Sequence, residues 1–148
     1  MKSIEAQLLS PECTRLLAEG IAQRFRDTPA LILLSGDLGA GKTSFAQGFI
    51  NNLEPCKHIS SPTYSYLNIY KARLPIFHFD LYRISSGSQL EELGLWEHLL
   101  DEGALRLVEW PEHAPGLEQH ADLHLILSFE GEHRQANLTY LKSFCPIG

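Results

Sequence analysis

The feature that most constrains this chain is a glycine-rich segment, GDLGAGKT, at residues 36–43. It follows the pattern G-x-x-x-x-G-K-[ST], in which glycines let a loop turn sharply and bring its backbone N–H groups close to a phosphate. The apolar run before it, residues 30–34, is too short for a core helix and predicts a central parallel strand. Residues 42–53 predict a helix, whose free N-terminal N–H groups favour an anion. A phosphate-binding loop requires this strand and this helix as its context.

The pattern before the loop predicts an edge strand and a helix. Residues 3–9 are mildly apolar, and Ser10 and Pro11 then provide a hydroxyl N-cap and a proline at the first helical position. Apolar residues continue at helical spacing until residues 27–29 end the helix. The expected apolar face comprises Cys13, Leu16, Leu17, Ile21 and Phe25.

The pattern after the loop predicts more strands than helices. Strands are expected at residues 64–70, 74–80, 104–110, 122–130 and 134–141, with one hairpin between the first two and another between the last two. Ser88 and Glu91 match a capping box, which predicts a single helix from residue 88 to about residue 100. The expected class is therefore α/β, with one P-loop NTPase-like domain over residues 1–148. Its mixed sheet should have a parallel core, antiparallel hairpins and helices on both faces.

Composition limits the partners and the compartment. The chain has 148 residues, of which 44% are apolar and 20% charged, so it can bury a core. Its net charge of −6 lacks the basic excess of a general nucleic-acid binder, so contact with RNA should be local or made through another protein. The first residues lack the apolar segment of a signal peptide, so none is expected, and no apolar run approaches the roughly 20 residues that span a bilayer. Three widely spaced cysteines are typical of reduced thiols, so we expect a cytoplasmic protein without membrane contact.

The residue types within the loop predict ATP and Mg2+ as ligands. Lys42 can reach the β- and γ-phosphates, and the Thr43 hydroxyl can coordinate the metal. Asp37 adds negative charge to the loop, so its side chain is expected to point away from the phosphates. The cofactor-binding residues expected here are Gly36, Asp37, Leu38, Gly39, Ala40, Gly41, Lys42, Thr43 and Ser44.

The metal also needs a carboxylate at the end of a neighbouring strand. Glu109 lies near the end of the short, mostly apolar strand expected at residues 104–110, and Asp80 ends the run 76–80. In P-loop proteins the acid after such a strand faces the same end of the sheet as the phosphate loop. The residues leave open which of the two lies nearer the metal. His78, two residues before Asp80, is expected to orient it.

Two other functions use the same loop. A small-molecule kinase adds an acceptor pocket and an arginine-bearing lid, which needs about 20–40 residues more than this chain can spare. A non-hydrolysing module uses ATP only to order a binding surface, and phosphate release in the presence of partners distinguishes it from an ATPase. No arginine finger, lid or water-positioning glutamine is evident near the loop, so hydrolysis is expected to be slow until a partner completes the site.

Five segments together resemble the TsaE (YjeE) family: GDLGAGKT at residues 36–43, SPTY at 61–64, HFDLYR at 78–83, EELGL at 91–95 and EWPE at 109–112. The first is generic, but the set is specific to this family and covers nearly the whole chain. The resemblance implies a bacterial ATPase needed to make threonylcarbamoyl-adenosine beside the tRNA anticodon. It also implies a partner, the TsaB–TsaD complex, which transfers the carbamoyl group to tRNA and which ATP hydrolysis resets between turnovers. Contact with tRNA would then be indirect.

The resemblance further implies roles by position. Lys42, Asp80 and Glu109 match catalytic positions, and Thr43 and Glu109 match the metal-binding positions. Trp110 adjoins the metal-shell acid and is expected to contact the nucleotide.

Five further positions follow from the same resemblance. Thr14 matches a threonine near the nucleotide base, and Pro11 and Arg134 are expected to border the adenine as well. Thr63 lies in a switch-like loop. Ser44 stands where the family usually has a second threonine, and it keeps the hydroxyl.

Overall fold

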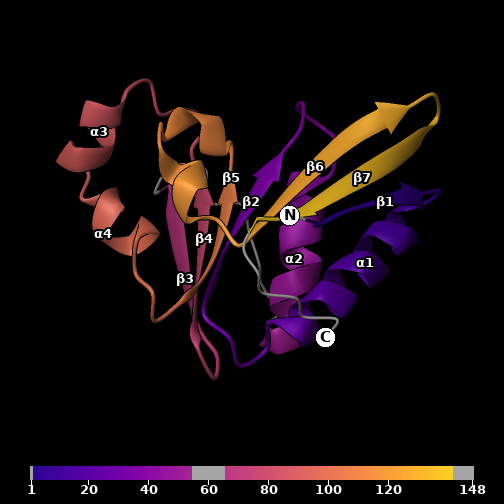
Figure 1. The fold of residues 1–148 in the computed structure, drawn as a ribbon, viewed down its shortest axis with the longest axis horizontal. Coiled ribbons are helices and arrows are strands. Elements are labelled where there is room, and N and C mark those ends of the chain that lie inside the picture. Colours follow the sequence, from indigo (N-terminus) through magenta and orange to yellow (C-terminus); the bar gives the residue numbers. More distant parts are fainter. Residues whose placement is uncertain (1, 55–65, 142–148) are drawn as a thin grey trace.

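A computed structural model gives the fold and describes residues 2–54 and 66–141 (Figure 1). Its strands are β1 (Lys2–Leu8), β2 (Ala30–Ser35), β3 (Leu67–Lys71), β4 (Pro75–Asp80), β5 (Leu105–Glu109), β6 (Leu123–Glu130) and β7 (His133–Tyr140). They form one sheet in the order β1-β7-β6-β2-β5-β4-β3. Strand β2 pairs in parallel with β5 and β6, and β4 pairs in parallel with β5. The pairs β1/β7, β6/β7 and β3/β4 are antiparallel, so the predicted mixed sheet with a parallel core is confirmed.

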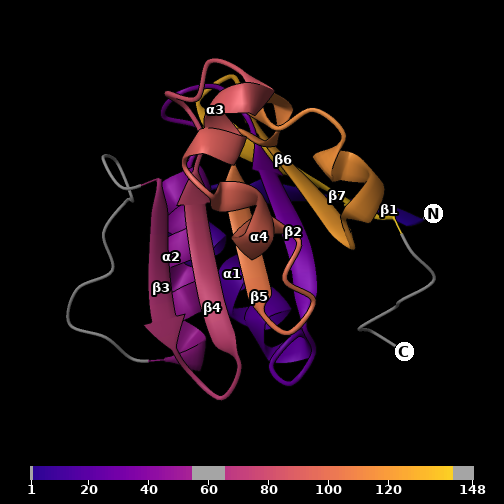
Figure 2. The same cartoon turned by 90° about the vertical axis from the view of Figure 1, so that its left-hand side faces the viewer.

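Helices cover both faces of this sheet, as predicted. One face carries α1 (Pro11–Arg24) and α2 (Lys42–Leu53); the other carries α3 (Gly87–Glu92), α4 (Leu95–Leu99) and the 3-10 helices Pro111–His113 and Leu117–His120 (Figures 1 and 2). The central strand β2 is apolar on both sides because both sides are buried. Ile32 and Leu34 pack toward α1 and α2, while Leu31 and Leu33 pack into the opposite core cluster. In the described part of the chain, no helix is long and apolar enough to cross a membrane.

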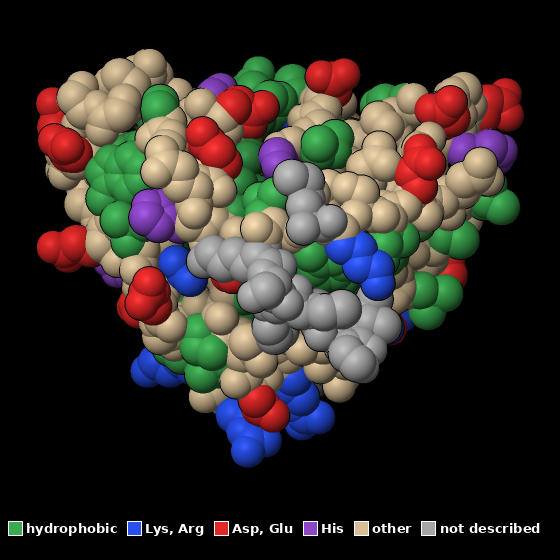
Figure 3. Space-filling model, viewed as in Figure 1, with side chains coloured by type: hydrophobic (Ala, Val, Ile, Leu, Met, Phe, Trp, Pro, Cys, Tyr) green, Lys and Arg blue, Asp and Glu red, His purple; other side chains and the backbone are tan. Residues whose placement is uncertain are grey.

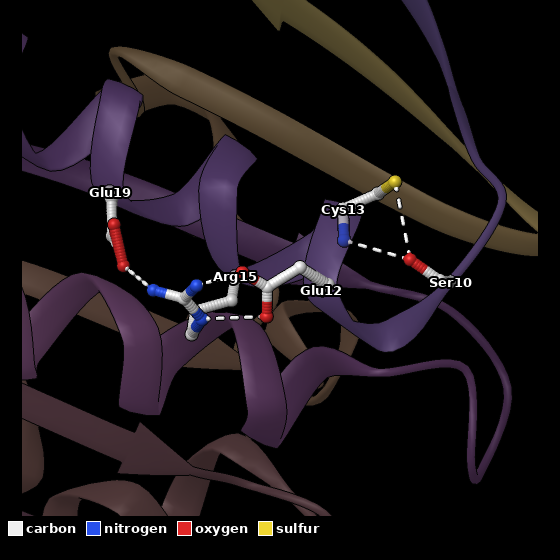
Figure 4. A network of polar contacts seen from close by, with 5 residues as sticks. All are labelled: Ser10, Glu12, Cys13, Arg15 and Glu19. Atoms are coloured by element: carbon white, nitrogen blue, oxygen red, sulfur yellow. Dashed lines mark hydrogen bonds and ion pairs between the residues drawn. The ribbon is translucent and has the colours of Figure 1, made fainter.

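Helix α1 starts where the sequence predicts. The Ser10 hydroxyl oxygen accepts a hydrogen bond from the Cys13 backbone N–H at 3.3 Å, and Pro11 is the first helical residue. Arg15 pairs with Glu12 and Glu19 along the outer side of the helix (Figure 4). These pairs are exposed, and because water and salt screen them they contribute little to stability.

The predicted apolar face of α1 is wrong at Leu16, whose side chain is 55% exposed. The helix instead buries Thr14, Ala18, Ile21 and Ala22. The physical reason is close packing on α2: a Cβ added at Gly48 would lie only 3.2 Å from the Ala18 Cβ. Small residues at the contact therefore matter more than the larger leucine nearby.

The predicted single helix at residues 88–100 is also wrong. Ser86, not Ser88, caps α3, and its hydroxyl accepts from the Gln89 backbone N–H at 3.3 Å. Gly94 then adopts φ +69° and separates α3 from α4. Because glycine enters this left-handed region without a Cβ penalty, Gly94 ends one helix and allows the next to start in a new direction.

Candidate phosphate-binding site

The glycine-rich segment forms a tight loop between β2 and α2. Gly36, Gly39 and Gly41 have φ values of +142°, +78° and +110°, which residues other than glycine rarely adopt. Gly41 is the N-cap of α2. Since the first backbone N–H groups of a helix have no partner within it, the loop and the start of α2 together can receive an anion.

Gly36→Ala is expected to destabilise the fold more than Gly39→Ala. A Cβ at Gly36 would lie 2.4 Å from the backbone oxygen of Leu127 in β6, whereas a Cβ at Gly39 meets nothing within 4 Å. Both variants carry backbone strain of about 1–3 kcal/mol, but only Gly36→Ala also collides with a backbone atom that cannot move cheaply. Thermal denaturation of the two variants tests this, and equal melting temperatures would contradict it.

The side chain of Lys42 lies between carbonyl oxygens of the loop and the ring of Trp110. Its side chain is buried, and its Nζ donates to the carbonyl oxygens of Gly36 and, at 3.1 Å, of Asp37. The same Nζ lies 3.8 Å from the centre of the Trp110 ring. Burial lowers the pKa of the Lys42 ammonium, and nearby carboxylates, first that of Glu109, oppose this shift. The lysine charge is thus held by loop carbonyls and one ring face.

Glu109 is held between two elements at the carboxyl end of the sheet. Thr43 Oγ1 donates to Glu109 Oε1 at 2.9 Å, and His78 Nε2 lies 2.6 Å from Glu109 Oε2. Glu109 lies beside Leu34 of β2 and Asp80 of β4 in the parallel register, so the ends of three strands meet here. The hydrogen bond of His78 goes to Glu109 rather than Asp80, which corrects the expectation that it orients Asp80.

The donor set suits Mg2+ when a nucleotide is present. Magnesium in such sites takes one or two protein oxygens and completes its shell with phosphate oxygens and water. The Thr43 hydroxyl and the Glu109 carboxylate supply oxygens of this kind. Among the described residues no group of three or more His, Cys, Asp or Glu side chains could hold a metal by itself, so a metal here would depend on the phosphates.

A cavity of about 230 Å³ opens beside these groups. It is lined by Leu38, Gly39, Gly41, Lys42, Thr43, Ser44, Asp80, Tyr82, Glu109, Trp110 and Arg134. The rings of Tyr82 and Trp110 form one wall, with centres 4.9 Å apart. Asp80 Oδ1 accepts from the Tyr82 backbone N–H at 3.0 Å. Trp110 has φ +60°, which re-aims the chain directly after β5 and brings its indole over Lys42.

The structure therefore gathers most of the sequence-predicted site around one cavity. Arg134 reaches it from β7, where its Nη2 donates to the Gly39 carbonyl at 3.1 Å. Gly36, Asp37 and Ala40 belong to the loop but do not line the cavity, and Asp37 is exposed.

The residues expected to border the adenine are only partly in this group. Pro11 and Thr14 lie in α1 and do not line the cavity. Thr14 is buried, and its hydroxyl has no hydrogen-bond partner among the described residues. Thr63 lies outside the described residues. Tyr82 was not assigned a role from the sequence, although an aspartate two residues before it is a signal for a local turn.

A glycine-rich loop between a central parallel strand and a helix, in a mixed sheet covered on both faces, defines an α/β protein with a P-loop-like fold. Comparison with known protein families identifies the family within this class. The family model for "Threonylcarbamoyl adenosine biosynthesis protein TsaE" matches residues 8–137, and the chain belongs to this family. The resemblance noted in the sequence is thus confirmed.

Comparison with individual proteins leads to the same family. The protein named tRNA threonylcarbamoyladenosine biosynthesis protein TsaE in Bacillus subtilis is 37% identical over 111 residues, which cover 74% of this chain and 68% of that protein. Its namesake in Haemophilus influenzae is 30% identical over 122 residues, or 82% and 77% of the two chains. The crystal structure of Bacillus subtilis YdiB superimposes with a TM-score of 0.72 at 25% identity, covering 95% of this chain and 87% of that one. The chain is therefore a member of a family that functions in tRNA threonylcarbamoyladenosine biosynthesis.

Proposed function

We propose that this chain binds ATP with Mg2+ in the cavity beside the glycine-rich loop and hydrolyses it slowly. The observation that carries the proposal is the approach of the Thr43 hydroxyl to the Glu109 carboxylate, 2.9 Å, next to the buried ammonium of Lys42. A phosphate chain needs a cation and backbone N–H groups on one side and a metal on the other. These groups lie together at the carboxyl ends of β2 and β5 and the start of α2.

The two carboxylates take different tasks in this proposal. Glu109 is buried and already accepts hydrogen bonds from Thr43 and His78, so it suits the metal and the water molecules around it. Asp80 is only half-buried and lines the cavity, so it suits the orientation of the attacking water. Bound Mg2+ would neutralise charge on the β- and γ-phosphate oxygens. Lys42 would stabilise the charge that remains on the transferred group.

We further propose that hydrolysis serves a TsaB–TsaD complex, and that tRNA is met only through that complex. Family membership supports the pathway, and surface charge supports the indirect contact. The chain carries a net charge of −6, and on the face in Figure 3 Asp and Glu side chains predominate toward the upper edge. A phosphate backbone would be repelled there. A cytoplasmic location suits a protein that acts in tRNA modification.

Nucleotide binding is tested by tryptophan fluorescence. The chain has two tryptophans: Trp110 lines the cavity above Lys42, while Trp96 lies in α4 against the opposite core cluster. ATP with MgCl2 should change the emission of the parent and of Trp96→Phe, and leave Trp110→Phe unchanged. The reverse pattern would move the nucleotide to another part of the molecule, and no change in any of the three proteins would refute binding at this cavity.

A further inference from the structure

His78 is a fully buried polar residue inside the candidate site. Strand β4 alternates between two core clusters: Phe77 and Phe79 point to one, while Ile76 packs into the other. His78 shares the face of Ile76, and its side chain is 0% exposed. The other buried residues of β4 are Ile and Phe, so a buried imidazole among them needs a reason, because burying a polar ring without a partner is unfavourable.

Its partner is the carboxylate that we assign to the metal. Glu109 Oε1 faces Thr43, and Oε2 lies 2.6 Å from His78 Nε2. His78 Nδ1 has no hydrogen-bond partner among the described residues, so the contact with Glu109 runs through Nε2, whose N–H the carboxylate accepts. The imidazole therefore fixes one carboxylate oxygen and leaves the other directed at the Thr43 hydroxyl.

Without the contact to His78, the Glu109 carboxylate could pair with Lys42 instead of Thr43. Glutamate has three rotatable bonds, and Glu109 is the leading electrostatic influence that favours the charged form of Lys42. A Glu109 side chain that turned toward Lys42 would neutralise the lysine needed for phosphate and would leave Thr43. His78 opposes this rearrangement by holding Oε2 from the β4 side.

We propose that His78 is a positioning residue, which holds the Glu109 carboxylate toward Thr43 and thereby couples the binding of Mg2+ to the binding of nucleotide. The inference rests on the proposed function, because it assigns His78 a task in the same site. Groups that orient a metal-binding side chain typically change metal affinity about 10–100-fold when they are replaced.

The test compares two amides of similar polarity. The Gln side chain places its N–H2 near the position of Nε2, whereas the shorter Asn places it near Nδ1. ADP binding is measured by calorimetry in MgCl2 and in EDTA, and the ratio of the two dissociation constants gives the coupling. We expect His78→Gln to keep the coupling within about threefold of the parent and His78→Asn to lose about tenfold or more. Binding in EDTA should stay the same in both.

A buried control separates positioning from general loss of stability. Phe79→Leu truncates a fully buried side chain on the opposite face of β4, so it should lower the melting temperature and leave the coupling unchanged. Coupling in His78→Asn equal to that of the parent would overturn the inference, as would a parallel loss of affinity in EDTA. A parent that binds ADP equally well with and without Mg2+ would instead refute the proposed metal site, and the role of His78 with it.

Discussion

Replacing Lys42 with alanine is expected to weaken ATP binding at least about tenfold, because one charge-assisted hydrogen bond contributes roughly 1.5–3 kcal/mol. The Lys42 ammonium is already directed at the cavity by two loop carbonyls and the Trp110 ring. Little reorganisation is then needed when phosphate arrives, so most of the interaction energy should appear in the affinity.

The measurement is calorimetry with ATP and MgCl2, with Lys71→Ala as the control. Lys71 is exposed at the end of β3, so its removal changes the net charge equally without touching the cavity. Calorimetry is preferred to fluorescence here, since Lys42→Ala also removes the cation beneath Trp110. Equal affinity of Lys42→Ala and Lys71→Ala would exclude Lys42 from the phosphate site.

The loop and its flanking elements could be predicted because the signal is local. The apolar run of β2, the glycines at positive φ and the start of α2 are adjacent in sequence, and each follows from backbone preference or burial. The same holds for the start of α1, because Ser10, Pro11 and Cys13, whose backbone N–H Ser10 accepts, lie within four consecutive residues.

Contacts between distant elements could not be predicted in this way. His78 and Glu109 meet only because β4 lies beside β5, and two helices separate these strands along the chain. Strand alternation puts His78 and Asp80 on one face, which suggested Asp80 as the partner. The prediction that Leu16 is buried was wrong for a similar reason. The helical spacing of apolar residues selects side chains by hydrophobicity, whereas the contact between α1 and α2 requires small residues such as Ala18.

Phosphate release by the isolated chain is expected to be slow and to rise strongly with a TsaB–TsaD pair. Among the described residues that line the cavity, Arg134 is the one arginine, and its Nη2 is directed to the Gly39 carbonyl. Phosphoryl transfer depends on positioning and on charge stabilisation, and a cationic group supplied by a partner adds about 10³–10⁵ in rate in GTPases. A site with a phosphate lysine and metal-binding oxygens, but without such a group, should bind ATP and turn it over slowly.

The experiment titrates phosphate release with the pair at fixed ATP. A rise that saturates would support the proposal. Asp80→Asn should remove most of the stimulated rate while retaining ATP binding, and Glu109→Gln should lower the stimulated rate far more than it lowers the binding of ATP with Mg2+. Glu102→Gln is a matched control, because Glu102 is exposed just before the amino end of β5, whereas the cavity lies at the carboxyl end of that strand. Stimulated release unchanged in Glu109→Gln would exclude the metal assignment. A fast rate in the isolated chain, unaffected by the pair and raised by a small-molecule acceptor, would show that the protein is a kinase, because the acceptor rather than a protein partner would then complete the site.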